Sequence, residues 1–247
     1  MNPGGPQQHP CPLCSNVQAD TLGVKEGYPV VRCRNCDLYY LQPMPGSEEL
    51  AAIYDDYDST EMYLRKYRKK ILTATYKQKL VGRYLGSGPK RFLDIGCNVG
   101  AVCEAARRQG FESTGIDLDE PTLQKARELS PGCRFECMTS YELAERGEKF
   151  DLVFCTEVLE HVPETHEFAA SFRDLLNDRG VLYLTTPDAG HRRVPADFIS
   201  WDEVKPPQHL IFYGRDTVTR LLEAHGFEII RFRWCHRANL RVIARAV

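Results

Sequence analysis

Residues 91–100 read RFLDIGCNVG, an apolar strand running into a glycine-bounded loop. A strand is expected over 91–95 and a helix over 101–109. Glycines at 96 and 100 allow a tight turn and a close approach of a ligand to the backbone. The N–H groups at the start of the helix, with its positive dipole end, would point at that ligand. The stretch therefore predicts a ligand-binding strand–loop–helix unit.

The spacing of these glycines separates the loop from a dinucleotide site. Such a site uses G-x-G-x-x-G, whereas Gly96 and Gly100 are spaced G-x-x-x-G, with Asn98 between them. Asp94 at the strand end would repel a pyrophosphate and attract an ammonium or sulfonium group. The loop therefore excludes an NAD-dependent oxidoreductase and favours a ligand that carries positive charge.

A second carboxylate ends the next expected strand, which covers 111–117. Asp117 lies 21 residues beyond Gly96. This separation suits a carboxylate that accepts hydrogen bonds from both hydroxyls of a ribose. Leu118 beside it offers an apolar face for adenine. The two strand ends together predict a site for an adenosine that carries a cationic group.

Four successive motifs resemble those of the class I S-adenosylmethionine-dependent methyltransferases. They are LDIGCNVG, GIDLD, DLVFCTEVLEHV and GVLYLTTP, and the resemblance covers about Lys90–Val247. It implies S-adenosylmethionine as the cofactor. Thr139 stands where many relatives carry an acidic residue that binds the adenine amine, a contact that a hydroxyl makes only weakly. Carried over by position, the expected cofactor-binding residues are Asp94, Gly96, Asn98, Gly100, Asp117, Leu118, Thr139 and Thr156.

Alternating strands and helices predict an α/β fold with a doubly wound, mostly parallel sheet. The expected strands cover 91–95, 111–117, 133–137, 150–155 and 180–186, and the expected helices cover 101–109, 121–129 and 167–177. A further helix is expected over Asp216–His225. An antiparallel pair, Phe227–Trp234 with Leu240–Val247, would close the sheet, as the resembled Rossmann-like methyltransferase fold usually does.

Four cysteines near the N-terminus form two C-x-x-C pairs, with 18 residues between Cys14 and Cys33. This spacing predicts a tetrahedral zinc–thiolate site in a small ribbon, with strands at Tyr28–Arg32 and Leu38–Leu41. Four thiolates leave no open position on the metal, so the zinc would be structural. The expected ligands are Cys11, Cys14, Cys33 and Cys36.

The chain is thus expected to contain three segments: a zinc ribbon over 1–45, a helical connector and cofactor lid over 46–89, and the methyltransferase domain over 90–247. In the connector, Ser47–Tyr54 is expected to be helical, and a long amphipathic helix follows, free of acidic residues from Met62 to Leu93. The resemblance implies that this helix covers the cofactor and that one of its cations meets the methionine carboxylate. A solvated basic face and a phosphate-contacting surface are the alternatives.

Candidate catalytic residues follow the expected strand 150–155. Glu157, Glu160 and His161 are spaced i, i+3, i+4, so a helical turn would place them on one face. His209 belongs to Lys205–Tyr213, which resembles the PP-x-HL-x-x-Y stretch of small-molecule methyltransferases, and Asp188–Asp202 is expected to lie over the site. His161 and His209 are candidate general bases. With Glu157 and Glu160 they could instead hold a second divalent cation, or they could only stabilise the loop.

Composition limits the function classes. The chain has 247 residues, a net charge of −2 and no apolar run long enough to cross a membrane. Its first residues lack the features of a signal peptide. The cysteines outside the C-x-x-C pairs are scattered through apolar strands and helices rather than paired, so a reducing, cytoplasmic location is expected. We predict methyl transfer to a small-molecule hydroxyl, with sugars or polyketide- and quinone-like aromatics as the acceptors that the resemblance implies. An RNA ribose 2'-O-methyltransferase and a non-catalytic scaffold remain alternatives, and the oligomeric state is open.

Overall fold

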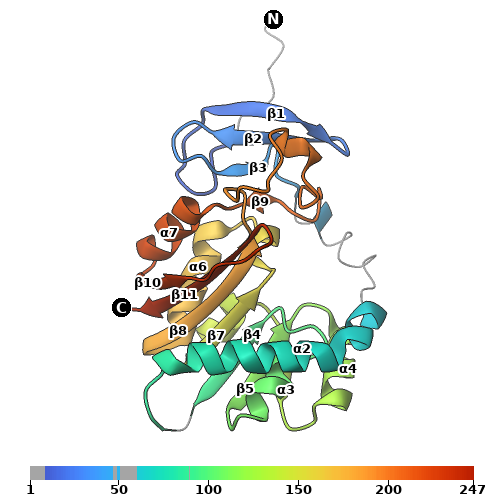
Figure 1. The fold of residues 1–247 in the computed structure, drawn as a ribbon, viewed down its shortest axis with the longest axis vertical. Coiled ribbons are helices and arrows are strands. Elements are labelled where there is room, and N and C mark those ends of the chain that lie inside the picture. The colour runs from blue at the N-terminus through green and yellow to red at the C-terminus, as the bar shows by residue number, and fades with distance from the viewer. Residues whose placement is uncertain (1–8, 47–48, 51–59, 89) are drawn as a thin grey trace, which may run out of the picture.

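The computed structural model describes residues 9–46, 49–50, 60–88 and 90–247. It contains two β-sheets, a small one near the N-terminus and a large one that carries the helices (Figure 1). The predicted helix Ser47–Tyr54 lies outside the described residues except for positions 49 and 50.

The large sheet has seven strands in the order β10-β11-β8-β7-β4-β5-β6. The pairs β4–β5, β5–β6, β4–β7 and β7–β8 are parallel, whereas β11 pairs antiparallel with both β8 and β10. This arrangement confirms the predicted doubly wound sheet with a closing antiparallel pair. The strands are β4 (Arg91–Ile95), β5 (Glu112–Asp117), β6 (Arg134–Cys137), β7 (Phe150–Thr156), β8 (Leu176–Pro187), β10 (Phe227–Phe232) and β11 (Asn239–Ala246).

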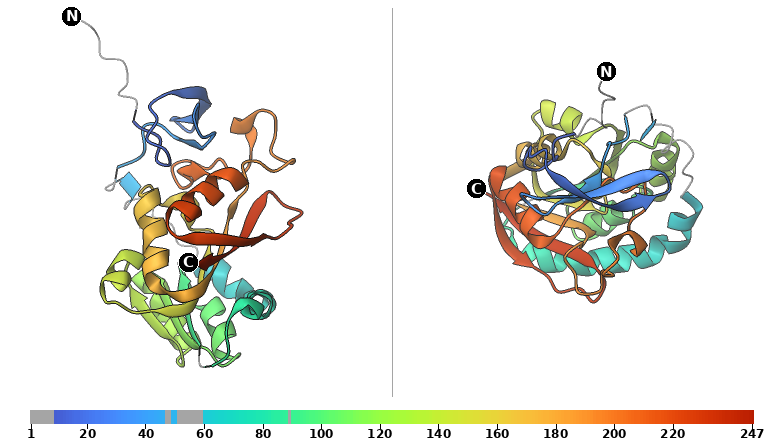
Figure 2. Two further views of the ribbon diagram at one scale, coloured as in Figure 1. Left: turned by 90° about the vertical axis from the view of Figure 1, so that its left-hand side faces the viewer. Right: turned by 90° about the horizontal axis from the view of Figure 1, so that it is seen from above.

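Helices cover both faces of this sheet. Helices α2 and α3 lie on one face, and α5 and α6 lie on the other (Figure 2). No described helix is both long enough and apolar enough to cross a lipid bilayer. The helices are α2 (Thr60–Val81), α3 (Ala101–Arg107), α4 (Glu120–Leu129), α5 (Ser140–Glu145), α6 (Thr165–Leu175) and α7 (Arg215–Ala224), with short 3-10 turns at Gly82–Tyr84, Leu159–His161 and Phe198–Ser200.

The order of the strands creates a crevice at the carboxyl edge of the sheet. From β4 the chain moves outward through β5 to β6, and then returns to the other side of β4 as β7. The connections after β4 and β7 therefore leave in opposite directions, and open α/β sheets bind ligands at such a point. The strands themselves are a rigid apolar base, because Leu93 and Val153 are fully buried.

The small sheet takes strands from two distant parts of the chain. Its order is β1-β2-β3-β9, with β1 (Ala19–Lys25), β2 (Tyr28–Cys33), β3 (Tyr39–Leu41) and β9 (Ile211–Phe212). Strand β9 pairs antiparallel with β3, and the backbone N–H of Leu41 donates to the carbonyl of Leu210 at 2.9 Å. The ribbon expected from residues 1–45 is therefore completed by a segment from within 90–247, and it lies above the large sheet in Figure 1.

The segment Asp188–Asp202 packs differently from the prediction. Its last residues lie against the small sheet: the ring of Phe198 stacks on Tyr39, with centroids 4.3 Å apart. Lys25 Nζ donates hydrogen bonds to the carbonyls of Ile199 and Trp201. Apolar stacking and these bonds hold the end of the segment against the ribbon, so this part of it packs on the small sheet.

Candidate active site and thiolate centre

The loop after β4 is shaped by close packing against protein side chains. Gly96 and Gly100 have φ angles of 73° and 74°, in the left-handed region that favours glycine. A Cβ at Gly96 would lie 2.5 Å from Val158 Cγ2, and one at Gly100 would lie 2.5 Å from Phe135 Cζ. The sequence correctly placed a tight turn here. The neighbours that exclude a Cβ, however, are Val158 and Phe135 rather than a ligand.

Asp94 presents an unsatisfied acceptor at the carboxyl end of β4. The residue is 2% exposed, and its Oδ1 has no hydrogen-bond partner among the described residues. Burial raises the pKa of this carboxyl to about 8, against the opposing charges of Lys70 and Lys77. A buried oxygen without a partner is costly unless a ligand supplies a donor. The position therefore fits the cationic ligand group that the sequence predicted.

Asp117 is held by the backbone of two loops. Its Oδ2 accepts from the N–H of Asn98 and its Oδ1 from that of Leu118, both at 2.8 Å. Asn98 has a φ of 50°, and its own Oδ1 accepts from the N–H of Val99. These bonds fix the carboxylate at the end of β5, while Leu118 beside it is 64% exposed. A preorganised carboxylate next to an open apolar surface suits a ribose and its base.

Two threonines, Thr139 and Thr156, were also predicted to bind the cofactor. Thr139 is the N-cap of α5: its Oγ1 donates to Glu142 Oε2 at 2.8 Å and accepts from the N–H of Glu142. Its proton is therefore committed, and only a lone pair is left for an adenine amine. Thr156 is the half-buried last residue of β7, paired with Thr185 of β8 at the crevice.

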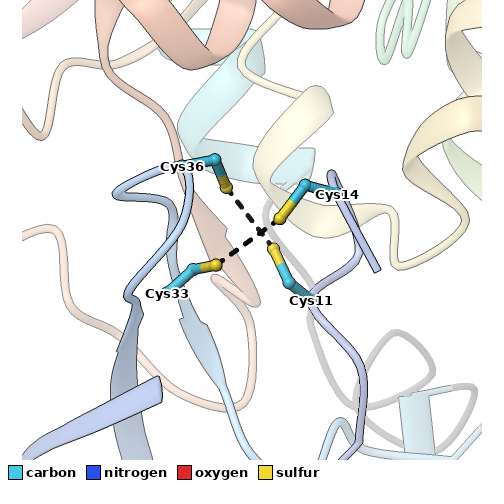
Figure 3. A group of neighbouring side chains, drawn as sticks. All are labelled: Cys11, Cys14, Cys33 and Cys36. Carbon is cyan, nitrogen blue, oxygen red and sulfur yellow. Dashed lines mark hydrogen bonds between the residues drawn. The ribbon is translucent and has the colours of Figure 1, made fainter. Parts of the chain in front are cut away.

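The four N-terminal cysteines point at one centre (Figure 3). Their sulfurs all lie within 4.8 Å of one another, with Cys11 to Cys36 at 3.6 Å and Cys14 to Cys33 at 3.5 Å. Tetrahedral zinc at about 2.3 Å from each sulfur would space the sulfurs by about 3.8 Å. The backbone N–H of Asn35 also donates to Cys33 Sγ, as expected around a thiolate. The donor set thus fits one tetrahedral metal ion.

A second cluster lies beside the crevice and joins Glu160, His161 and His209. One ligand atom from each lies within 4.8 Å of the others. His161 Nδ1 donates to the carbonyl of Gln208, and His209 Nδ1 donates to the carbonyl of Glu203, each at 2.7 Å. These bonds fix the tautomers, so each Nε2 carries a lone pair. Burial lowers the pKa of both rings, that of His209 to about 3, and both are neutral at physiological pH.

Glu160 completes this cluster with an open oxygen. Its side chain is 1% exposed, and its Oε2 accepts from Thr186 Oγ1 at 2.9 Å. Its Oε1 has no partner among the described residues and lies 3.9 Å from His161 Nε2. Burial, with the nearby charge of Glu157, raises the pKa of this carboxyl to about 8. One open carboxylate oxygen and two imidazole lone pairs form a set that can bind a divalent cation or a hydroxyl group.

Glu157 does not join that cluster, which corrects the predicted helical turn. Its φ is 58°, in the left-handed region, and the 3-10 turn begins only at Leu159. Glu157 Oε1 accepts from Thr185 Oγ1 at 2.6 Å and from Asn239 Nδ2 at 2.8 Å. The left-handed residue breaks the i, i+3, i+4 geometry, so the second site keeps three of its four predicted members.

Sequence reasoning did not select Arg233 and Arg241. Both line a cavity of about 390 Å³ between α2 and the β10–β11 hairpin, together with Lys77 and Tyr183. Arginine is frequent near the two closing strands, but that frequency does not show which arginines face a cavity. The sequence predicts a basic helix in the connector without selecting any one of its cations. In the structure, Lys70 and Lys77 are the two whose charges act on Asp94.

The chain is similar in sequence to a known protein family and to curated relatives. A family described as "Methyltransferase domain" matches residues 63–231. The "Ubiquinone biosynthesis O-methyltransferase" of Pasteurella multocida (strain Pm70) is 38% identical over 172 residues, which cover 61% of this chain and 65% of that protein. The chain therefore spans just under two thirds of that relative's length.

Solved structures share the fold at low sequence identity. Magnesium protoporphyrin IX methyltransferase (ChlM) from Synechocystis PCC 6803 with bound SAH is 17% identical, with a TM-score of 0.58 over 78% of this chain and 89% of that one. The [4+2]-cyclase SpnF is 16% identical, with a TM-score of 0.61 over 83% and 98%. Because one of these is named as a cyclase, the likeness establishes the fold and leaves the chemistry to the site.

Proposed function

Since the chain belongs to the methyltransferase-domain family, we propose that it transfers a methyl group from S-adenosylmethionine to a hydroxyl oxygen of a small-molecule acceptor. The observation that carries the choice of oxygen is the Glu160–His161–His209 cluster beside the crevice. Its open carboxylate oxygen and two imidazole lone pairs suit a group that must be gripped and deprotonated. The name of the Pasteurella relative, an O-methyltransferase, supports the same acceptor atom.

The cofactor would lie across the carboxyl ends of β4 and β5. Asp117 accepts from the ribose hydroxyls, and Leu118 faces the adenine. The open Oδ1 of Asp94 accepts from the amino group of the methionine part. Lys70, the cation that acts most strongly on Asp94, would meet the methionine carboxylate. When bound, S-adenosylmethionine would supply a methyl group on a cationic sulfur. The acceptor oxygen attacks the methyl carbon in line, and the sulfur leaves as the neutral thioether.

The cluster fits a divalent cation better than a lone general base. A ring with the low basicity of His209 takes up a proton poorly, because a useful base has a pKa near the working pH. The same ring is a good ligand, since its Nδ1–H is fixed by a carbonyl and its Nε2 is free. Mg²⁺, Mn²⁺ or Zn²⁺ held by Glu160, His161 and His209 would lower the pKa of the acceptor hydroxyl.

The thiolate centre would hold zinc with a structural role. All four ligands come from the protein, so no position is open for a substrate. Thiolates of this kind persist in a reducing compartment, and the cytoplasmic location expected from the sequence stays a prediction.

The release of S-adenosylhomocysteine tests the proposed function. Purified protein should bind S-adenosylmethionine by calorimetry and should release S-adenosylhomocysteine when given a catechol-type acceptor, but not the matched compound without hydroxyls. Turnover that occurs only with RNA, and binding of RNA that weakens steeply with added salt, would favour the ribose methyltransferase instead. Absence of cofactor binding would contradict the proposal and favour a scaffold.

A further inference from the structure

A cavity lies between α2 and the β10–β11 hairpin. It measures about 390 Å³, which is within the range of small-molecule sites. In Figure 1, α2 crosses one face of the sheet below the hairpin that closes it. The lining residues come from α2, β8 and the turn end of the hairpin: Leu72, Thr73, Tyr76, Lys77, Leu80, Tyr183, Arg233 and Arg241.

Three cations of this lining share one cavity without a carboxylate. Lys77, Arg233 and Arg241 make no ion pair with any carboxylate of the described residues. The N–H of Arg233 donates to the carbonyl of Arg241 at 2.8 Å, which holds the two arginine backbones together. Lys77 Nζ lies 5.7 Å from the centre of the Tyr183 ring. The carboxylates that act on Lys77, those of Glu157 and Asp94, lie outside this lining. The two arginines face the cavity with no carboxylate in its wall, and an anionic ligand would relieve their mutual repulsion.

The rest of the lining is apolar and aromatic. Leu72 is 73% exposed and Tyr76 is 66% exposed, although both belong to the central turns of a helix. The buried ring of Tyr183 forms the wall on the side of the sheet. Large apolar side chains left open beside cations are typical of a site for a ligand with one apolar and one charged part.

The cavity continues toward the proposed active site. A smaller cavity of about 40 Å³ shares Arg233 and Arg241 with it and is also lined by Asn239. Asn239 donates to Glu157, which directly follows β7 at the crevice. A ligand seated on the arginines therefore lies along a path to the crevice.

We propose that this cavity holds the methyl acceptor, and that the acceptor has a planar or apolar body carrying a carboxylate or phosphate that binds Arg233 and Arg241. This inference rests on the proposed function, because it names the acceptor class for that site. The cofactor has a carboxylate of its own, but its place is beside Lys70 and Asp94. The two arginines line the cavity with Tyr183 of β8, and Lys77 of the same lining also acts on Asp94, so the cavity adjoins the proposed cofactor site.

A pair of fluorescent probes tests the site without any need for turnover. The anionic probe is 1-anilinonaphthalene-8-sulfonate, and N-phenyl-1-naphthylamine is its neutral counterpart without the sulfonate. The folded wild-type protein should bind the anionic probe in a 1:1 complex. The double variant Arg233→Gln/Arg241→Gln should weaken that binding by about tenfold or more and leave the neutral probe unchanged. Tyr76→Ala should weaken both probes.

Controls separate this site from the cofactor site and from general charge. Arg231→Gln/Arg237→Gln removes two exposed arginines of the same hairpin and should leave binding of both probes unchanged. Saturating S-adenosylhomocysteine should not displace the anionic probe, and its own affinity should be the same in the Arg233/Arg241 variant. Displacement by 3,4-dihydroxybenzoate or by phenyl phosphate would show which anion is preferred, and neutral catechol should displace the probe only at higher concentration.

Three results would overturn the inference. They are equal binding of the anionic probe to wild type and to the Arg233/Arg241 variant, displacement of that probe by S-adenosylhomocysteine, and displacement by catechol as effective as that by both anions. If the arginine variant unfolds, Lys77→Gln provides the same comparison. None of these results depends on methyl transfer, so failure here and failure of the proposed function can be told apart.

Discussion

The thiolate centre and the Glu160 cluster are two groups of potential metal ligands built in opposite ways. In the first, four sulfurs face one another, and all four positions of a tetrahedral ion would be filled. In the second, two imidazole lone pairs and one unpartnered carboxylate oxygen leave most of the coordination sphere of an ion open. A closed set of ligands can contribute only stability, whereas an open set can also bind a substrate atom.

The same contrast extends to the two sheets. The small sheet lies beside the thiolate centre and is joined to the later part of the chain through the pairing of β3 with β9. At the edge of the large sheet, both Asp94 and Glu160 bury an oxygen with no partner among the described residues. Such oxygens destabilise a fold, so their presence at a crevice indicates binding. Changes at the thiolate centre should therefore lower stability, whereas changes at the crevice should lower ligand binding.

The largest effect is expected from Cys33→Ser. Loss of one thiolate should release the zinc, a contribution on the order of 10 kcal/mol in small zinc domains, and should disorder the ribbon sheet. Because β9 belongs to that sheet and His209 lies two residues before it in sequence, acceptor turnover should fall by about 100-fold or more. The affinity for S-adenosylhomocysteine should change by less than about threefold. Metal analysis, turnover and calorimetry measure the three quantities.

The half-buried Cys235, far from the ribbon in sequence, provides the control, since Cys235→Ser should keep zinc and activity. Wild-type protein prepared without chelators and found free of zinc would contradict the assignment. Full turnover in a metal-free Cys33→Ser protein would show instead that the two regions are independent.

His209→Ala should reduce kcat/KM by roughly 10²–10⁴-fold while cofactor affinity stays the same, because the open cluster acts on the acceptor. His236→Ala, at an exposed histidine outside the cluster, is the control. Mild chelation should abolish turnover, and added Mg²⁺ or Mn²⁺ should restore it while the zinc content remains constant. Chelator-insensitive turnover that still depends on His209 would favour a base without metal, and full activity in both His161→Ala and His209→Ala would remove the cluster from the mechanism.

Asp117→Ala should weaken S-adenosylmethionine binding by about 2–4 kcal/mol, since two charge-assisted hydrogen bonds to the ribose are lost. Calorimetry measures this change directly. Asp119→Ala, which removes only the N-cap of α4, is the matched control and should affect stability more than binding. An unchanged affinity in Asp117→Ala would refute the ribose assignment.

The smallest effect is the pH dependence set by Asp94. Burial raises the pKa of its carboxyl from 3.8 to about 8, so the group is neutral below that pH and must ionise to pair with a cationic ligand. Cofactor affinity should therefore rise with pH, by at most about tenfold per unit, and should level off above about pH 8. Titration calorimetry across this range measures the slope.

The stability of the free protein should fall with rising pH, whereas its cofactor affinity rises. Because the pKa of the Asp94 carboxyl is higher in the folded than in the unfolded protein, its contribution to stability is full below pH 3.8 and is lost as the pH rises to about 8. Asp94→Asn should therefore flatten the pH dependence of binding, weaken binding itself, and raise the melting temperature at pH 8. A lower melting temperature in that variant would show that the buried carboxylate stabilises the free protein.

Local patterns predicted the large sheet and the four cysteines well. Strands such as Phe150–Thr156 are largely apolar runs. The spacing of a C-x-x-C pair is itself enough to predict that its two sulfurs lie close together. The sequence could not show that β9 joins the ribbon, because two residues carry no periodicity and their partner is far away in the chain. Strand β1 was missed since most of its side chains are exposed. The spacing of Glu157 suggested a helix that its left-handed backbone prevents, and Thr139 satisfied an N-cap pattern as well as a ligand pattern.

The pairing of β3 with β9 also sets an order of events during synthesis. The four cysteines leave the ribosome before β9 does, so their centre can form while β9 is still unmade. Strand β3 must wait for Ile211, about 10–30 s later at ordinary elongation rates. During that interval its edge, with the apolar side chains of Tyr40 and Leu41, has no partner and is open to pairing with other chains. The ribbon can thus begin to fold before β9 is made, and it is finished only after β9 has joined it.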